Sequence, residues 1–222
     1  MGKLYVIESG SDAAGKRTQS ELLYKYFEQK GENIKKVEFP NYDSVSSTFV
    51  KMYLGGEFGK KPDEVSPYIA SIFFAIDRYV TYKKELESFY TKGGIIIADR
   101  YTTSNMVYQA SKYDNKSEKS KFLDWLFDYE FGILHMPKPD RVFFLDMPFE
   151  ISYALLQERD KAQGKKSGTK KDIHEDDPDY LKKTYENARF VCENFGWTKI
   201  DCVSEGKLLG IEDIQKKIIN EL

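Results

Sequence analysis

The chain has 222 residues, 41% of them hydrophobic and 32% charged, so it can bury a substantial core and does not have the composition of a disordered protein. Its formal net charge of −2 argues against a broad surface for binding nucleic acid. No apolar run approaches the ~20 residues that a membrane span needs, so we expect no membrane partner and a cytoplasmic location, with Cys192 and Cys202 reduced.

Apolar runs typical of strands alternate along the chain with longer segments of helical period. In the first half of the chain, the pattern predicts a strand over residues 4–8, a helix over 15–29, a strand over 34–39, helices over 44–54 and 66–90, and a strand over 95–98. It then predicts helices over 103–111 and 118–134 and a strand over 141–145. The last predicted elements are helices over 149–161 and 178–195, a strand over 197–203 and a helix over 211–222. Strands separated by helices are joined by right-handed crossovers, which give a parallel sheet covered on both faces. We therefore expect one α/β domain over residues 1–222 with a five-stranded parallel sheet.

One stretch, residues 161–177, is rich in Lys, Gly, Asp and Glu and poor in apolar residues. Such a segment can be a solvated surface loop. It can also be a small lid, because the covers of active sites are drawn from weakly packed segments. Both interpretations stay open at this point.

A glycine-rich segment separates the first predicted strand from the first predicted helix. Residues 10–16 read G-S-D-A-A-G-K, which has the spacing of the phosphate-binding loop G-x-x-x-x-G-K. In such a loop the backbone N–H groups turn inward, the helix N-terminus adds partial positive charge and the lysine reaches the β- and γ-phosphates. A turn without a ligand is the alternative, but the position between strand and helix favours a three-layer P-loop NTPase fold that binds ATP. The residues expected to contact ATP are Gly10, Ala13, Ala14, Gly15, Lys16, Arg17 and Thr18.

The residue after the lysine departs from the strict pattern. A Ser or Thr hydroxyl normally binds Mg²⁺ at this position, but the chain has Arg17, and the hydroxyl follows as Thr18. This argues against a GTPase switch or a motor ATPase and leaves the ligand of the metal open.

A second polar cluster follows the third predicted strand, where residues 99–109 read D-R-Y-T-T-S-N-M-V-Y-Q. Ligands of open α/β sheets bind at the carboxyl ends of the strands, so Asp99 can meet a metal or phosphates there. A structural ion pair between Asp99 and Arg100 is the alternative.

Taken together, these elements resemble the thymidylate kinase family over most of the chain. The matching pieces are the loop ending in G-K-x-T-Q, Phe39-Pro40 after the second strand, F-A-I-D-R at residues 74–78, the D-R-Y element at 99–109, and P-K-P-D followed by a strand and Leu-Asp at 137–146. The resemblance implies transfer of the ATP γ-phosphate to dTMP, with Mg²⁺ and a homodimer. Two alternatives are a deoxynucleoside kinase or a kinase for another pyrimidine monophosphate, and a catalytically weak regulatory protein that binds nucleotides.

The resemblance also implies roles for single residues. Phe74 would stack on the pyrimidine ring, and Arg78 and Gln109 would hydrogen-bond its edge. Arg100 would hold the acceptor phosphate, and Asp12 would bind the sugar 3′-hydroxyl. Tyr101 would lie where a 2′-hydroxyl would clash. The remaining residues expected at the acceptor site are Phe39, Pro40, Ser104 and Tyr108, although Phe74 and Tyr108 could also be plain core residues.

Two cations typical of the family are missing. Ala13 stands where some relatives carry a catalytic arginine, and Asn41-Tyr42 stands where many carry a phosphate-binding arginine. Because phosphoryl transfer depends on neutralising charge, the missing cation should come from the lid region. Arg159 is the first choice, since its planar fork suits phosphate, ahead of Lys165, Lys166, Lys170 and Lys171. We expect His135 and His174 to be surface or core residues.

Overall fold

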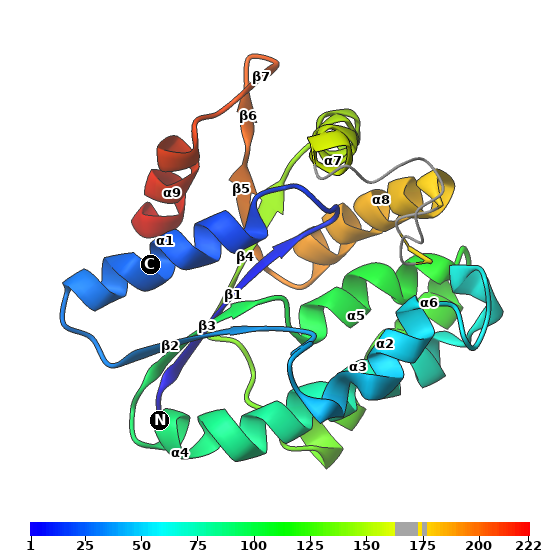
Figure 1. Ribbon diagram of the computed structural model, residues 1–222, viewed down its shortest axis with the longest axis horizontal. Helices are drawn as coiled ribbons and strands as arrows, with labels where there is room; N and C mark the ends of the chain where they lie inside the picture. Colours follow the sequence, from blue (N-terminus) through cyan, green and yellow to red (C-terminus); the bar gives the residue numbers. More distant parts are fainter. Residues whose placement is uncertain (163–172, 175–176) are drawn as a thin grey trace.

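The computed structural model describes residues 1–162, 173–174 and 177–222 (Figure 1). At its centre is a parallel sheet of five strands in the order β2-β3-β1-β4-β5. The strands are β1 (Lys3–Ser9), β2 (Ile34–Glu38), β3 (Ile95–Asp99), β4 (Arg141–Asp146) and β5 (Thr198–Asp201). The predicted five-stranded α/β fold is therefore confirmed, with strand ends shifted by one or two residues.

Helices cover both faces of this sheet. Figure 1 shows α1 and α9 on one side and α3, α4 and α5 on the other. The helices are α1 (Lys16–Gln29), α2 (Thr48–Leu54), α3 (Pro67–Thr81), α4 (Glu87–Thr91), α5 (Thr102–Tyr108), α6 (Lys116–Phe127), α7 (Phe149–Ala162), α8 (Pro178–Asn194) and α9 (Ile211–Asn220).

Two hydrophobic cores, one on each face of the sheet, explain why the inner strand β3 is apolar over residues 95–98. In β3, Ile97 packs on the α1 and α9 side with Leu23 and Ile218, while Ile96 packs on the opposite side with Leu86. A strand buried on both faces has no polar side, so it appears in the sequence as an unbroken apolar run.

Several local features differ from the prediction. The helix expected over residues 66–90 is α3 and α4 joined by a π-helical turn at Tyr82–Leu86. A second π-helical turn, Asp128–Ile133, follows α6. The strand expected over 197–203 ends at Asp201, and a small hairpin of β6 (Val203–Ser204) and β7 (Lys207–Leu208) follows it. Two-residue strands are too short to produce an alternating pattern, which is why this hairpin was not predicted.

The cysteine prediction is confirmed, because Cys192 and Cys202 are both free and buried. In the part of the chain that the structure describes, no helix is long and apolar enough to span a bilayer. Most of the stretch considered as a lid, including Lys165, Lys166, Lys170 and Lys171, lies outside the described residues; Ile173 and His174 lie within them.

Candidate active site

The glycine-rich loop lies between β1 and α1, against the side of α8. A Cβ at Gly10 would lie 2.8 Å from Ala188 Cβ and 2.9 Å from Tyr185 Cα, so no larger residue fits there without a shift. Ala13 and Gly15 adopt left-handed backbone angles, with φ of 61° and 86°. Left-handed residues curl the loop and direct its N–H groups inward, as a phosphate-binding loop requires. The residues expected to contact ATP all lie on this loop and on the first turn of α1.

Lys16 is buried at the start of α1. Its Nζ donates to Ser9 Oγ at 2.8 Å and to the Ser11 carbonyl at 3.0 Å, and it lies 3.7 Å from Asp12 Oδ1. Burial and the positive charge of Arg100 lower the pKa of Lys16. The ammonium group is therefore held in a desolvated position where an anionic phosphate would stabilise its charge.

Arg100 joins the third strand to the phosphate-binding loop. Its φ of 66° turns the chain at the end of β3. Its guanidinium donates to Asp12 Oδ1 and, at 3.2 Å, to the Tyr108 hydroxyl, and lies 3.8 Å from Glu8 Oε1. Burial alone would raise the pKa of Asp12, but the charges of Arg100 and Lys16 outweigh it and bring this pKa below its ordinary value. Asp12 is therefore an ionised hydrogen-bond acceptor.

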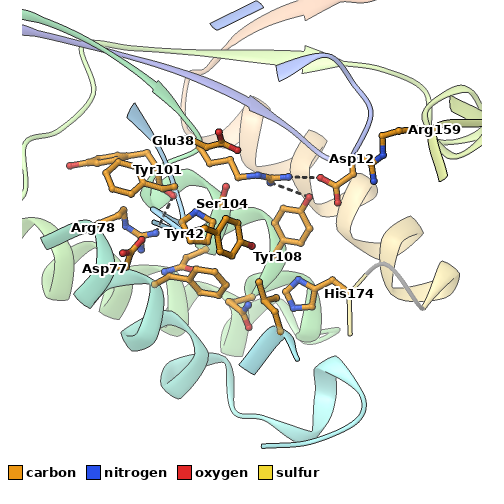
Figure 2. Close-up of a pocket in the computed structure, with 17 residues that line it drawn as sticks. Asp12, Glu38, Tyr42, Asp77, Arg78, Tyr101, Ser104, Tyr108, Arg159 and His174 are labelled. Carbon is orange, nitrogen blue, oxygen red and sulfur yellow. Dashed lines mark hydrogen bonds and ion pairs between the residues drawn. The ribbon is translucent and has the colours of Figure 1, made fainter. Parts of the chain in front are cut away.

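A cavity of about 310 Å³ opens between the carboxyl ends of the strands and the helices α3 and α5. Figure 2 shows Asp12 and Arg159 at one end of it and Asp77 and Arg78 at the other. Every residue expected at the acceptor site lines this cavity: Asp12, Phe39, Pro40, Phe74, Arg78, Arg100, Tyr101, Ser104, Tyr108 and Gln109. Arg159, from the last turns of α7, also lines it, whereas Asp99 does not.

Gln109 is the residue of this cavity whose polar atoms are least satisfied. Its side chain is fully buried, and neither its amide oxygen nor its amide nitrogen has a hydrogen-bond partner among the described residues. An unpaired buried amide is costly, because it has lost water without gaining a partner. Its position in the cavity wall makes it available to a ligand with both a donor and an acceptor.

The cavity wall also contains residues that were not predicted to line the site, namely Glu38, Tyr42, Leu54, Asp77, Asn105 and His174. Asp77 accepts from the Asn41 backbone N–H at 2.8 Å and from Ser46 Oγ at 2.6 Å, so it fixes the chain that follows Phe39-Pro40. Its place beside Arg78 in the F-A-I-D-R element was the available signal. No such signal exists for His174, which stands in a polar stretch without a motif.

His174 is buried, as predicted for a core residue, and it also lines the wall of the cavity, which was not predicted. Its ring stacks on Tyr108 with centroids 5.6 Å apart, and Nε2 lies 2.9 Å from the Tyr53 hydroxyl. Lys112 Nζ donates to the same hydroxyl at 3.3 Å, and an ammonium can only donate. Because burial lowers the pKa of His174, its ring is neutral, and Nε2 shares one hydrogen bond with the Tyr53 hydroxyl.

Acidification is expected to destabilise the fold through His174. Burial, reinforced by the charge of Lys112, lowers the pKa of His174 from 6.5 to about 3. Between these values the unfolded chain binds a proton that the folded chain does not. The free energy of unfolding should therefore fall by about 1.4 kcal/mol per unit as the pH drops through this window. Urea unfolding at several pH values between 7 and 5 measures this slope.

The matched variant for this test is His174→Phe, which retains a flat ring but cannot titrate. It should be less stable than the parent at pH 7, because the Tyr53 hydroxyl loses its hydrogen bond with the ring nitrogen. Its stability should fall less steeply toward pH 5. Equal slopes in the two proteins would assign the pH dependence to other groups.

Comparison with known proteins gives consistent matches. The family model for thymidylate kinase matches residues 7–207. A thymidylate kinase from Plasmodium falciparum is 28% identical over 222 residues, covering 100% of this chain and 90% of the relative. The solved thymidylate kinase of Candida albicans superimposes with a TM-score of 0.69 at 20% identity, covering 99% of this chain and 90% of that one. The enzyme of Ehrlichia chaffeensis gives 0.66 at 18% identity, covering 99% and 98%. At these identities the structural likeness supports the fold alone.

Proposed function

Because the chain belongs to the thymidylate kinase family, we propose that its cavity binds dTMP and that its glycine-rich loop binds the ATP that phosphorylates it. The enzyme transfers the γ-phosphate of ATP to dTMP and releases ADP and dTDP. The observation that carries the assignment of the cavity is Gln109, a fully buried amide without a partner among the described residues. A pyrimidine edge offers it a carbonyl and an N–H together.

The base would lie at the end of the cavity formed by α3. Phe74 would stack on the ring, and Arg78 and Gln109 would hydrogen-bond its edge. Tyr101 is buried and donates to the Pro137 carbonyl at 3.0 Å. A ring held in this way is rigid, which supports the proposal that Tyr101 excludes a 2′-hydroxyl. Phe39, Pro40, Ser104 and Tyr108 would complete the wall.

The acceptor phosphate would lie at the opposite end, beside Arg100. Asp12 would accept from the sugar 3′-hydroxyl, consistent with its lowered pKa. No general base is needed, because the attacking phosphate oxygen is already ionised. The reaction therefore depends on alignment and on positive charge near the transferred group.

The donor phosphates would be held by the loop amides and by Lys16. Mg²⁺ fits the residues nearby, because it takes oxygen ligands and needs only one or two carboxylates beside the phosphates. Asp99 is our proposed ligand, and Glu38 is its register partner on β2. When bound, Mg²⁺ neutralises charge on the donor phosphates. The hydroxyl that normally binds the metal after the lysine is absent in Arg17, and Thr18, which is exposed on α1, carries the next hydroxyl in the chain.

Arg159 is our proposal for the cation that replaces the arginine absent at position 13. It lines the cavity, and its charge acts on Asp12 of the phosphate-binding loop. It lies 3.6 Å from the Asp160 carboxylate, a contact that could orient it. We further propose a single domain over residues 1–222 whose lid lies within residues 161–177.

We also propose a cytoplasmic homodimer. The support for dimerisation is an apolar face on α3, where Ile69, Ile76 and Tyr79 remain 47%, 38% and 37% exposed. Side chains of this kind are candidates for burial against a second copy.

The function is tested by ADP release from Mg-ATP with dTMP, dUMP, dCMP, UMP, AMP or thymidine as acceptor. Turnover that depends strongly on dTMP is expected. Turnover with thymidine instead would favour a nucleoside kinase, and ATP binding without turnover on any acceptor would favour a regulatory protein.

Gln109→Leu tests the assignment of the cavity. Loss of both amide contacts should raise the KM for dTMP by about tenfold or more, with the KM for ATP little changed. Gln215→Leu on α9 is the matched control, because Gln215 is also a buried amide without a partner among the described residues but does not line the cavity. Equal effects of the two substitutions would contradict the assignment.

A further inference from the structure

Arg78 is held from behind by a carboxylate that does not line the cavity. Its Nε donates to Glu130 Oε2 at 3.0 Å, and its Nη2 donates to Glu130 Oε1. Arg78 is only 2% exposed and Glu130 is fully buried. The two side chains form a fork-to-fork pair, which fixes the plane of the guanidinium as well as its position.

Glu130 also accepts hydrogen bonds from side chains of α5, the helix that forms another side of the cavity. Its Oε2 accepts from Thr102 Oγ1 at 2.7 Å, and its Oε1 lies 3.4 Å from Asn105 Nδ2. Arg78 Nη1 points in turn to the Tyr101 carbonyl at 3.4 Å. One buried carboxylate thus connects Arg78, Asn105 and, through Arg78, Tyr101, and all three line the cavity.

The backbone beneath Glu130 is unusual in the same place. Glu130 lies in the π-helical turn Asp128–Ile133. A π turn holds one more residue than an α turn and therefore changes which side chains face inward; such turns occur often at functional sites.

Stability alone does not account for this arrangement. A buried ion pair gains little over two apolar side chains of the same volume, because both charges must be removed from water. Its particular effect is on Arg78, whose positive charge is neutralised while its remaining N–H groups keep a fixed direction.

We propose that Glu130 is a positioning residue for base recognition, which holds Arg78 as an oriented, charge-neutralised hydrogen-bond donor at the base end of the cavity. This inference rests on the proposed binding of dTMP in the cavity. A guanidinium can only donate. An oriented guanidinium therefore donates to the C4 carbonyl oxygen of thymine or uracil and opposes the C4 amino group of cytosine, which is itself a donor.

The experiment compares Glu130→Gln, Arg78→Met and the double variant with the parent. For each protein, kcat and KM are measured for dTMP, dUMP and dCMP, the KM is measured for ATP, and thermal unfolding is recorded. Glu130→Gln keeps the size of the side chain but removes its charge and one acceptor. Glu221→Gln is the control, since it alters a glutamate in an exposed ion pair with Arg141.

Glu130→Gln should raise the KM for dTMP by about tenfold, with kcat and the KM for ATP within about twofold of the parent. The preference for dUMP over dCMP should fall by about tenfold, because a loosely held arginine no longer opposes the amino group. In the Arg78→Met background the same change should add less than about twofold, as expected when one residue acts through the other.

Two outcomes overturn the proposal while leaving dTMP binding in place. In the first, Arg78→Met raises the KM for dTMP and Glu130→Gln does not. In the second, the effects of the two substitutions are additive. If Arg78→Met itself leaves the KM for dTMP unchanged, the assignment of the cavity fails and the role of Glu130 fails with it.

If Glu130→Gln does not fold, Glu130→Asp tests the same proposal, because it keeps the charge but moves it away from Arg78. It should give the same selective rise in the KM for dTMP. A fall in kcat and a rise in the KM for ATP that accompany the rise in the KM for dTMP would indicate a structural role only.

Discussion

Lys16→Ala is expected to lower kcat by about 10²–10³-fold, as loss of one preorganised charge-stabilising donor does in other enzymes. Lys16 Nζ lies among Ser9 Oγ, the Ser11 carbonyl and Asp12, inside the loop that would hold the donor phosphates. Steady-state ADP release at saturating ATP and dTMP measures the effect. Lys25→Ala, on an exposed face of the same helix, should leave kcat unchanged.

The same substitution should not unfold the protein. Burial lowers the pKa of Lys16, so the folded state holds this charge less favourably than the unfolded chain does. Removing it should leave the melting temperature unchanged or raise it. An active and folded Lys16→Ala enzyme would falsify the assignment of the phosphate-binding loop.

Arg159→Ala is expected to lower kcat by about 10³-fold, the lower end of the effect of an arginine that stabilises phosphoryl transfer. The loop carries Ala13 where an arginine could have stood, and Arg159 lines the cavity beside Asp12. The KM for ATP should change little, because the contact would strengthen in the transition state. Single-turnover kinetics separate this step from product release.

Two further variants show whether the loss of rate in Arg159→Ala is specific to the guanidinium at this position. Arg159→Lys should recover only part of the rate, since an ammonium cannot make the bidentate contact. Arg189→Ala, half-exposed on α8 and paired with Asp146, is the matched control and should remain active. If Arg159→Ala has the kcat of the parent, Arg159 does not stabilise the transferred phosphoryl group, and a cation within residues 163–172 becomes the candidate for that role.

The sheet and its ligand-binding edge were predictable from the apolar pattern, whereas the residues of the acceptor site were expected from the resemblance to the family. Strands buried on both faces leave unbroken apolar runs, such as residues 95–98, and parallel strands bring their carboxyl ends to one edge. The polar residues that follow these runs therefore had to meet. This is why the segments of Asp12 and Arg100, which follow β1 and β3, could be expected at one edge, whereas Gln109 at the end of α5 was expected there only through the resemblance.

Contacts between distant helices could not be predicted in this way. Arg78 and Glu130 are 52 positions apart, and no periodicity relates them. The residues Asp128–Ile133 carry no pattern that distinguishes a π-helical turn from an α-helix, so the sequence predicted a plain helix over 118–134. Nothing in the sequence connects His174 to the site, because no acid or cysteine stands at metal spacing from it and its partners Tyr53 and Tyr108 belong to separate elements.

The close approach of Gly10 to α8 also limits how this protein can evolve. Ala188 and the backbone at Tyr185 occupy the space that a side chain at position 10 would need. The volumes at positions 10 and 188 are therefore linked, and a larger residue at either position must be compensated at the other or by a displacement of α8. Among orthologues, we expect these two sites to change together.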